Sequence, residues 1–164
     1  MLRTTLVAVA LLAGLTPAQS AAAQSAPIPG VGFKLGDDVA TVRAALRTDM
    51  QPEAMPKSSI LPANVPDPNK GKAVLHLRTK GIWAFFSPTG VVETIRLDAP
   101  FAGNVLGVKL GDAPKQITEK LGNPIQKPST AFLTMQSYRY VLDDTAYVNY
   151  DANDDGVQII LITK

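Results

Sequence analysis

Six short segments of the chain alternate apolar and polar residues, and they fall into two groups of three. A period of two places successive side chains on opposite faces of a strand, so each segment is predicted to be a β-strand. Turn residues such as Gly, Pro and Asp separate the segments within each group and predict antiparallel connections. The predicted strands cover residues 73–79, 82–87, 91–97, 136–142, 145–150 and 157–163.

A helix is predicted ahead of each group, after a motif that occurs twice. Gly32–Asp37 returns as Gly107–Asp112, a shift of 75 residues, and six of the fifteen positions from Gly32 to Leu46 are identical to their counterparts. Such self-similarity predicts a repeated unit. Asp37 or Asp38, and Asp112, are the expected N-caps. The apolar positions expected to face the core are Val39, Val42 and Leu46 in the first helix and Ile117 and Leu121 in the second. Gly122 and Pro124 are expected to end the second helix.

The motifs of the two copies resemble those of a known superfamily. Each copy has a Leu-Gly-Asp cap and a Gly-Val turn before its last strand, and the second copy adds the exit Leu121-Gly-Asn-Pro124. These features resemble the β-lactamase inhibitor protein fold and the outer-membrane assembly lipoproteins of the SmpA/OmlA type. The resemblance implies a helical element on one face of an antiparallel sheet, and two sheets that form a concave surface for gripping another protein. The chain departs from it in having no cysteine, for either a lipid anchor or a disulfide.

The expected fold class is therefore α+β, a tandem repeat of helix plus antiparallel β-meander with two sheets in one mature domain. The first repeat would cover residues 24–100 and the second 101–164, after a signal peptide over 1–23. The signal-peptide prediction rests on the positive charge of Arg3, the apolar run 6–15 and a cleavage site near Ala23. The run is too short to span a bilayer, so no transmembrane segment is expected in the mature chain, and a periplasmic or secreted location follows.

The two copies differ most in the segment after the first helix. Residues 49–70 contain five prolines and no strand pattern. A connection that long is either functional or disordered, and both interpretations are open.

Hairpin registers predict which face of the first group is free. With Lys80-Gly81 as a two-residue turn, Arg78 lies opposite Trp83 and the helix covers Leu75, Ile82 and their neighbours. The other face would then carry an unusual mixture of aromatic and basic side chains, which either binds a partner or shields the sheet. In the second group a turn at Asp143-Asp144 gathers tyrosines on one face. The predicted partner-binding residues are His76, Arg78, Trp83, Phe85, Arg96, Tyr138, Tyr140 and Tyr147.

Calcium binding, catalysis and nucleic-acid binding have less support in the sequence than protein binding. Asp151, Asn153 and Asp155 match the start of a calcium loop, but Ile162 stands where a bidentate Glu is needed, and any hairpin turn also prefers these residues. Calcium is therefore a minor alternative to an expectation of no cofactor. His76 is the only histidine and cysteine is absent, so nucleophile–base pairs have few candidates and no enzyme is expected. A net charge of +2 gives no reason to expect a nucleic-acid partner.

These observations predict an exported protein-binding module. The expected partner is another protein, namely an enzyme, a toxin or an envelope component. The leading hypothesis is an inhibitor or immunity protein that acts by steric occlusion. The alternatives are an envelope assembly or scaffolding factor, and a calcium-dependent binding module.

Overall fold

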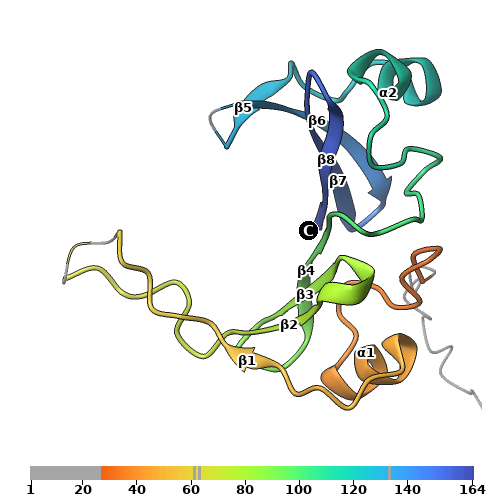
Figure 1. Cartoon of the computed structure of the whole chain (residues 1–164). Coiled ribbons are helices and arrows are strands. Elements are labelled where there is room, and N and C mark those ends of the chain that lie inside the picture. The colour runs from red at the N-terminus through yellow and green to blue at the C-terminus, as the bar shows by residue number, and fades with distance from the viewer. Residues whose placement is uncertain (1–26, 61, 63, 133) are drawn as a thin grey trace, which may run out of the picture.

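The computed structural model describes residues 27–60, 62, 64–132 and 134–164, which form two short helices and eight strands (Figure 1). The predicted signal peptide lies outside the described residues. No helix within the described ranges is long and apolar enough to cross a membrane. The elements are α1 (Val39–Leu46), β1 (Glu53–Ala54), β2 (Ala73–Leu77), β3 (Ile82–Phe86), β4 (Val92–Leu97), α2 (Pro114–Leu121), β5 (Ser129–Ala131), β6 (Met135–Asp143), β7 (Ala146–Asn153) and β8 (Gly156–Thr163).

All eight strands belong to one antiparallel sheet in the order β1-β2-β3-β4-β8-β7-β6-β5. The strands β4 and β8 join its two halves, with Leu97 opposite Ile160 and Thr94 opposite Thr163. The prediction of a tandem helix-plus-meander fold with two sheets is therefore wrong. Had the halves formed separate sheets, β4 and β8 would each have left an edge of unpaired N–H and C=O groups, and their pairing removes both edges.

The sheet is curved, and Figure 1 shows both helices on its convex side. The segment after α1 passes through β1 and extends away from the sheet at one end, while β5 and its connection to β6 project at the other end. These two projections, called here the 55–72 arm and the β5–β6 arm, flank the concave side. The sheet therefore has one covered face and one face open between two arms.

The first helix begins after the expected cap Asp38, but the N-cap of the second helix is Ala113 and not the expected Asp112, whose side chain accepts the Lys109 N–H instead. The Asp38 side chain accepts a hydrogen bond of 2.7 Å from the Thr41 N–H at the start of α1. In α2, Pro114 is the first residue and the Gln116 side chain accepts a 2.7 Å bond from the Ala113 N–H. These caps satisfy amides that a helix leaves without internal partners.

The two Gly-Asp motifs make the same backbone hydrogen bonds to the sheet. The Gly36 N–H donates to the Val92 carbonyl over 2.8 Å, and the Val92 N–H donates to Asp37. Gly111 and Asp112 make the corresponding bonds with Val157, at 2.8 and 2.9 Å. Each motif therefore attaches the start of a helix to the beginning of a strand, β4 in the first half and β8 in the second.

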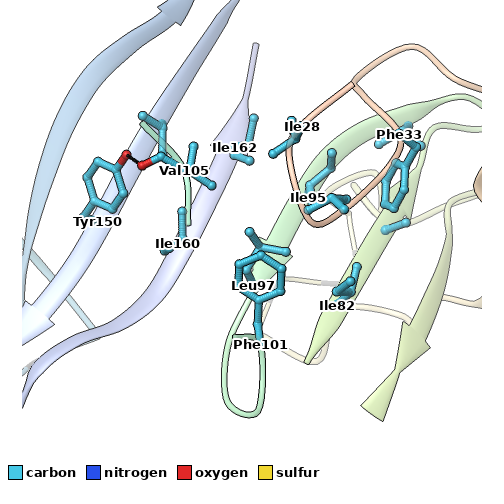
Figure 2. Packing of buried hydrophobic residues seen from close by; sticks show 14 of the residues in the cluster. Ile28, Phe33, Ile82, Ile95, Leu97, Phe101, Val105, Tyr150, Ile160 and Ile162 are labelled. Carbon is cyan, nitrogen blue, oxygen red and sulfur yellow. Dashed lines mark hydrogen bonds between the residues drawn. The ribbon is translucent and has the colours of Figure 1, made fainter. Parts of the chain in front are cut away.

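The apolar core lies between the helices and the convex face of the sheet, and it crosses the β4–β8 junction. Figure 2 shows Ile95 and Leu97 of β4 close to Ile160 and Ile162 of β8. All four side chains are fully buried. The Tyr150 hydroxyl donates a 2.8 Å hydrogen bond to the Val105 carbonyl within this core. The two halves of the chain thus bury one common core rather than two.

The register of the first hairpin differs from the predicted one. Strand β2 ends at Leu77 because residues 78–80 form a 3-10 turn, and His76 rather than Arg78 lies opposite Trp83. This is a shift of two residues, which leaves each side chain on its predicted face. A bulge between Phe85 and Phe86 then places Val92 opposite Phe86, and the Val92 side chain is fully buried in the core.

In the second half, the irregularity between Val141 and Asp143 shifts the register by one residue. Tyr138 lies opposite Tyr150 and Tyr140 opposite Val148, both on the core side. Tyr147 pairs with Val141 on the concave side instead. Because a shift of one residue exchanges the faces, the predicted grouping of Tyr138, Tyr140 and Tyr147 on one face is not observed.

Candidate functional site

The concave face of the sheet is built from both halves of the chain. Side chains that share this face lie in rows across the strands, because paired residues point to the same side. One row crosses β2, β3, β4, β8, β7 and β6 through His76, Trp83, Arg96, Leu161, Asn149 and Arg139. The next row is Val74, Phe85, Thr94, Thr163, Tyr147 and Val141.

Aromatic rings form a stack along the first half of this face. The ring centroids of His76 and Trp83 are 3.3 Å apart with an interplanar angle of 13°. Phe85, two residues further along β3, lies 6.2 Å from Trp83 and almost parallel to it. The guanidinium carbon of Arg96 is 5.3 Å from the Trp83 ring, within cation–π range. The stack therefore presents wide apolar area beside a fixed positive charge.

Asp98 holds the two largest members of this group in place. Its Oδ2 accepts hydrogen bonds of 3.0 Å from both Trp83 Nε1 and Arg96 Nε, and Arg96 Nη2 lies 2.9 Å from the same oxygen. The Asp98 N–H in turn donates to the Gly81 carbonyl, so the carboxylate is anchored at the turn before β3. Side chains fixed in this way lose less conformational entropy on binding than free ones would.

The environment of His76 lowers the pKa of its imidazole. Partial burial is the largest cause, followed by the nearby positive charge of Arg78; Arg96 acts in the same direction and Asp98 opposes it. Because the ordinary histidine pKa is already near 6.5, His76 is neutral at neutral pH. The ring stacks on Trp83 as an uncharged aromatic group.

Two hollows lie next to each other on the concave face, and Arg96 lines both. The first measures about 550 Å³ and is bordered by His76, Arg78 and Trp83, with Gln158 and Ile159 on its other side. Arg78, at the 3-10 turn, is exposed at this border.

The second hollow measures about 260 Å³ and lies between the two arms. Met55 and Asn69 of the 55–72 arm border it, and so does Phe132 of the β5–β6 arm. Phe132 is 63% exposed, an unusual state for a phenylalanine. One depression is therefore lined by residues that lie 63 to 77 positions apart in the sequence.

Asp151 is the buried polar group of this second hollow. Its residue surface is only 3% exposed, and its Oδ1 has no hydrogen-bond partner among the described residues. Burial raises the pKa of the Asp151 carboxyl, while a hydrogen bond from the Ser137 side chain and the positive charge of Arg96 act in the opposite direction. A carboxylate in this state is unusual, because buried charges in proteins are normally paired.

The structure divides the eight predicted binding residues between the two faces. His76, Trp83, Phe85 and Arg96 lie together on the concave face, and Arg78 stands at its border. Tyr147 also lies there, and its ring centroid is 4.3 Å from the guanidinium carbon of Arg139. Tyr138 and Tyr140 lie on the core side instead, where the Tyr140 hydroxyl donates to the Gly122 carbonyl.

The three residues of the calcium hypothesis, Asp151, Asn153 and Asp155, do not lie in one common site. Asp151 lines the second hollow from β7. Asn153 Oδ1 accepts the Asp155 N–H over 2.9 Å, as a turn-forming side chain does. Among the described residues, no group of three or more His, Cys, Asp or Glu side chains could hold a metal ion.

Sequence reasoning missed two functional candidates, Asp98 and the concave-face role of Asp151. Asp98 comes directly after the last residue of β4, so no alternation pattern assigns it to a face. Asp151 drew notice only through the adjacent turn motif. Its position opposite Ile159 depends on a strand pairing that the bulge after Asp151 alters.

No protein-family model matches the chain, and no curated protein matches it either. Among solved structures, the chain is similar to a DUF4309 family protein (YjgB) from Bacillus subtilis. The match has 14% sequence identity and a TM-score of 0.46, and it covers 80% of this chain and 81% of that one. A likeness this weak carries no conclusion about fold or function.

Proposed function

We propose that the chain is an exported binding module that holds another protein on the concave face of its sheet. The observation that carries the proposal is the fixed stack of His76, Trp83 and Phe85 with Arg96, open to solvent between two arms. Tryptophan and arginine are the residue types that most often supply the binding energy of protein interfaces.

The physical character of this face supports binding over plain cover. Asp98 fixes both Trp83 and Arg96, which restricts their motion before any partner arrives. Simple shielding of the sheet needs no such preorganisation, and it needs no exposed Phe132 on the neighbouring arm. Apolar area, fixed charge and concave shape together match what a protein ligand requires.

The proposed role is that of an inhibitor or immunity protein. A partner held between the two arms would have its contact surface covered, so binding itself would block access to that surface. The proposal places this action in the periplasm or outside the cell, in keeping with the signal peptide predicted for residues 1–23.

Photo-crosslinking in the native host tests the proposal. A photoreactive amino acid at position 78 lies at the border of the concave face, and one at position 115 lies on α2, where the Lys115 side chain is 86% exposed. We expect a discrete protein adduct from position 78 and none from position 115. Equal adducts at both positions, or none at position 78, would contradict the proposal.

The identity of the adduct decides between the two roles that this surface could serve. A hydrolase, another enzyme or a toxin would agree with inhibition or immunity. An outer-membrane assembly component would instead establish the scaffolding role.

A further inference from the structure

The second hollow has a chemical preference of its own, set by Asp151 beneath it. The side chain sits on β7 with Ser137 of β6 and Ile159 of β8 as its direct neighbours in the pairing. Although it is almost fully buried, its Oδ1 has no hydrogen-bond partner within the described part of the chain. A buried acceptor left unsatisfied costs about 1–3 kcal/mol, so the folded protein tolerates a substantial penalty here.

The other charged side chains of this hollow already have partners. Lys72 forms an ion pair with Glu93, and Arg96 forms one with Asp98. Asp151 is therefore the one charged group of the lining that has no ion pair among the described residues. A cation that enters the hollow would find this carboxylate available, whereas an anion would be repelled by it.

The walls of the hollow suit a long aliphatic stem. Phe85, Ile159 and Leu161 supply the apolar lining from the sheet, and Met55 and Phe132 add to it from the arms. Lysine and arginine pack their methylene groups along such surfaces while the charged end reaches a polar partner. The volume of about 260 Å³ is several times the roughly 30 Å³ that one water molecule occupies in the liquid. A whole side chain can therefore enter.

We infer that this hollow receives a lysine or arginine side chain of the bound protein, with its charged end on Asp151 and its stem against Phe85 and Leu161. The inference rests on the proposed function, because the donor belongs to a protein docked on the concave face. It adds a chemical requirement to that function, since the partner must present a basic residue where it meets the two arms. The bond formed would be charge-assisted, and therefore stronger than a bond to a neutral donor.

Small amino-acid probes test the hollow without knowledge of the partner. The protein is titrated with N-acetyl-lysine methylamide and N-acetyl-arginine methylamide, and binding is followed by amide chemical shifts in NMR. N-acetyl-norleucine methylamide, which keeps the stem and lacks the charge, is the control. We expect the basic probes to shift Asp151, Ile159 and Leu161 and to bind at least about tenfold more tightly than norleucine.

Asp151→Asn removes the charge while keeping the shape, and it should lower the affinity for the basic probes at least about tenfold. Asp154→Asn, in the exposed turn between β7 and β8, is the matched control and should leave their binding unchanged. Equal binding of norleucine and lysine probes, or undiminished binding by the Asp151→Asn variant, would overturn the inference.

A protein captured at position 78 separates this inference from the proposed function. If Trp83→Ala weakens that complex and Asp151→Asn does not, the concave face binds the partner but the basic-residue requirement is wrong. If neither change weakens the complex, the proposed function itself fails. If both weaken it, both proposals are supported.

Discussion

At the scale of single residues, Asp151 connects stability with binding. Its carboxyl is buried without a counter-charge at hydrogen-bonding distance, which favours the protonated form in the folded state. Proteins retain such costly groups mainly where function needs them. A substitution that removes the charge should therefore stabilise the fold while it impairs recognition.

The pH dependence of this effect has a definite sign. Burial raises the folded-state pKa of Asp151, so in the range between the ordinary carboxyl pKa and the raised value the folded protein binds more protons than the unfolded chain. The free energy of unfolding therefore falls as pH rises through this range. The Asp151→Asn variant has no carboxyl at this position and does not lose this unfolding free energy as pH rises. We expect it to be more stable than the wild type at neutral pH, by on the order of 1 kcal/mol.

Urea unfolding between about pH 3 and pH 8 measures this difference. The gain should shrink as pH falls below the ordinary carboxyl range, because Asp151 is then protonated in both states. A gain that is constant with pH, or a less stable variant at neutral pH, would show that Asp151 is satisfied in the folded protein.

Gly81 shows how one backbone position supports the binding face. Its φ is +62°, and a Cβ there would lie 1.9 Å from the Asp98 carbonyl oxygen. Asp98 is the residue that orients Trp83 and Arg96, so Gly81→Ala should displace the anchor of the stack. We expect a loss of about 3 kcal/mol or more in unfolding free energy, together with a change in Trp83 fluorescence.

Gly90→Ala is the matched control for that substitution. Gly90 also has a positive φ, +78°, but a Cβ there meets nothing within 4 Å. Only the conformational cost of about 1–2 kcal/mol should remain, with Trp83 fluorescence unchanged. Equal effects of the two substitutions would mean that the contact with Asp98 is unimportant.

At the scale of elements, the two helices differ in how their N-termini are satisfied. Asp38 caps α1 with its side chain, whereas Ala113 stands at the same position before α2 and has no side-chain acceptor. Ala113 already has the extended backbone that an N-cap needs, with φ −65° and ψ 152°. The second helix therefore lacks one capping bond that a single substitution can add.

Ala113→Ser should raise the free energy of unfolding by about 1 kcal/mol, because the hydroxyl can accept an amide hydrogen of the first turn. Asp38→Ala should lower it, for the opposite reason. Thermal unfolding by circular dichroism measures both. Lys115→Ala removes only an exposed ion pair with Glu119 and should change little; a neutral Ala113→Ser would contradict the capping argument.

The sequence predicted elements better than registers. Asp38, Pro114 and the alternating segments locate both helices and six of the strands, since caps and periodicity are local signals. Strands β1 and β5 were missed because Glu53–Ala54 and Ser129–Ala131 are too short to show a period. The bulges next to Phe85 and Val141 were missed as well, because an extra residue in a strand depends on what the strand pairs with.

The size of each register error decided which of the predicted binding residues were assigned to the correct face. On β3, the error at the turn was two residues, so Trp83 and Phe85 kept their predicted face. On β6, the error was one residue, so Tyr138 and Tyr140 moved to the core side. Alternation alone fixes which residues of a strand share a face, and only the pairing fixes which face is buried.

At the scale of the whole molecule, the sequence did not predict that the two halves share one sheet. Whether β4 pairs with β8 depends on contacts between residues more than 60 positions apart, such as Leu97 and Ile160, and neither strand carries a local sign of its partner. The shared sheet has a functional consequence. The concave face extends from His76 on β2 to Arg139 on β6, and an arm stands at each end of it.

The most direct test of the account is the affinity of the crosslinked partner for variants of the concave face, measured by calorimetry. Trp83→Ala combined with Arg78→Ala should weaken binding at least about 30-fold, since interface anchors of these types contribute about 2 kcal/mol or more. The melting temperature should change little. Leu106→Ala, which shortens an exposed apolar side chain outside this face, is the control and should bind as the wild type does. Unchanged affinity of the Trp83→Ala/Arg78→Ala variant would contradict the account.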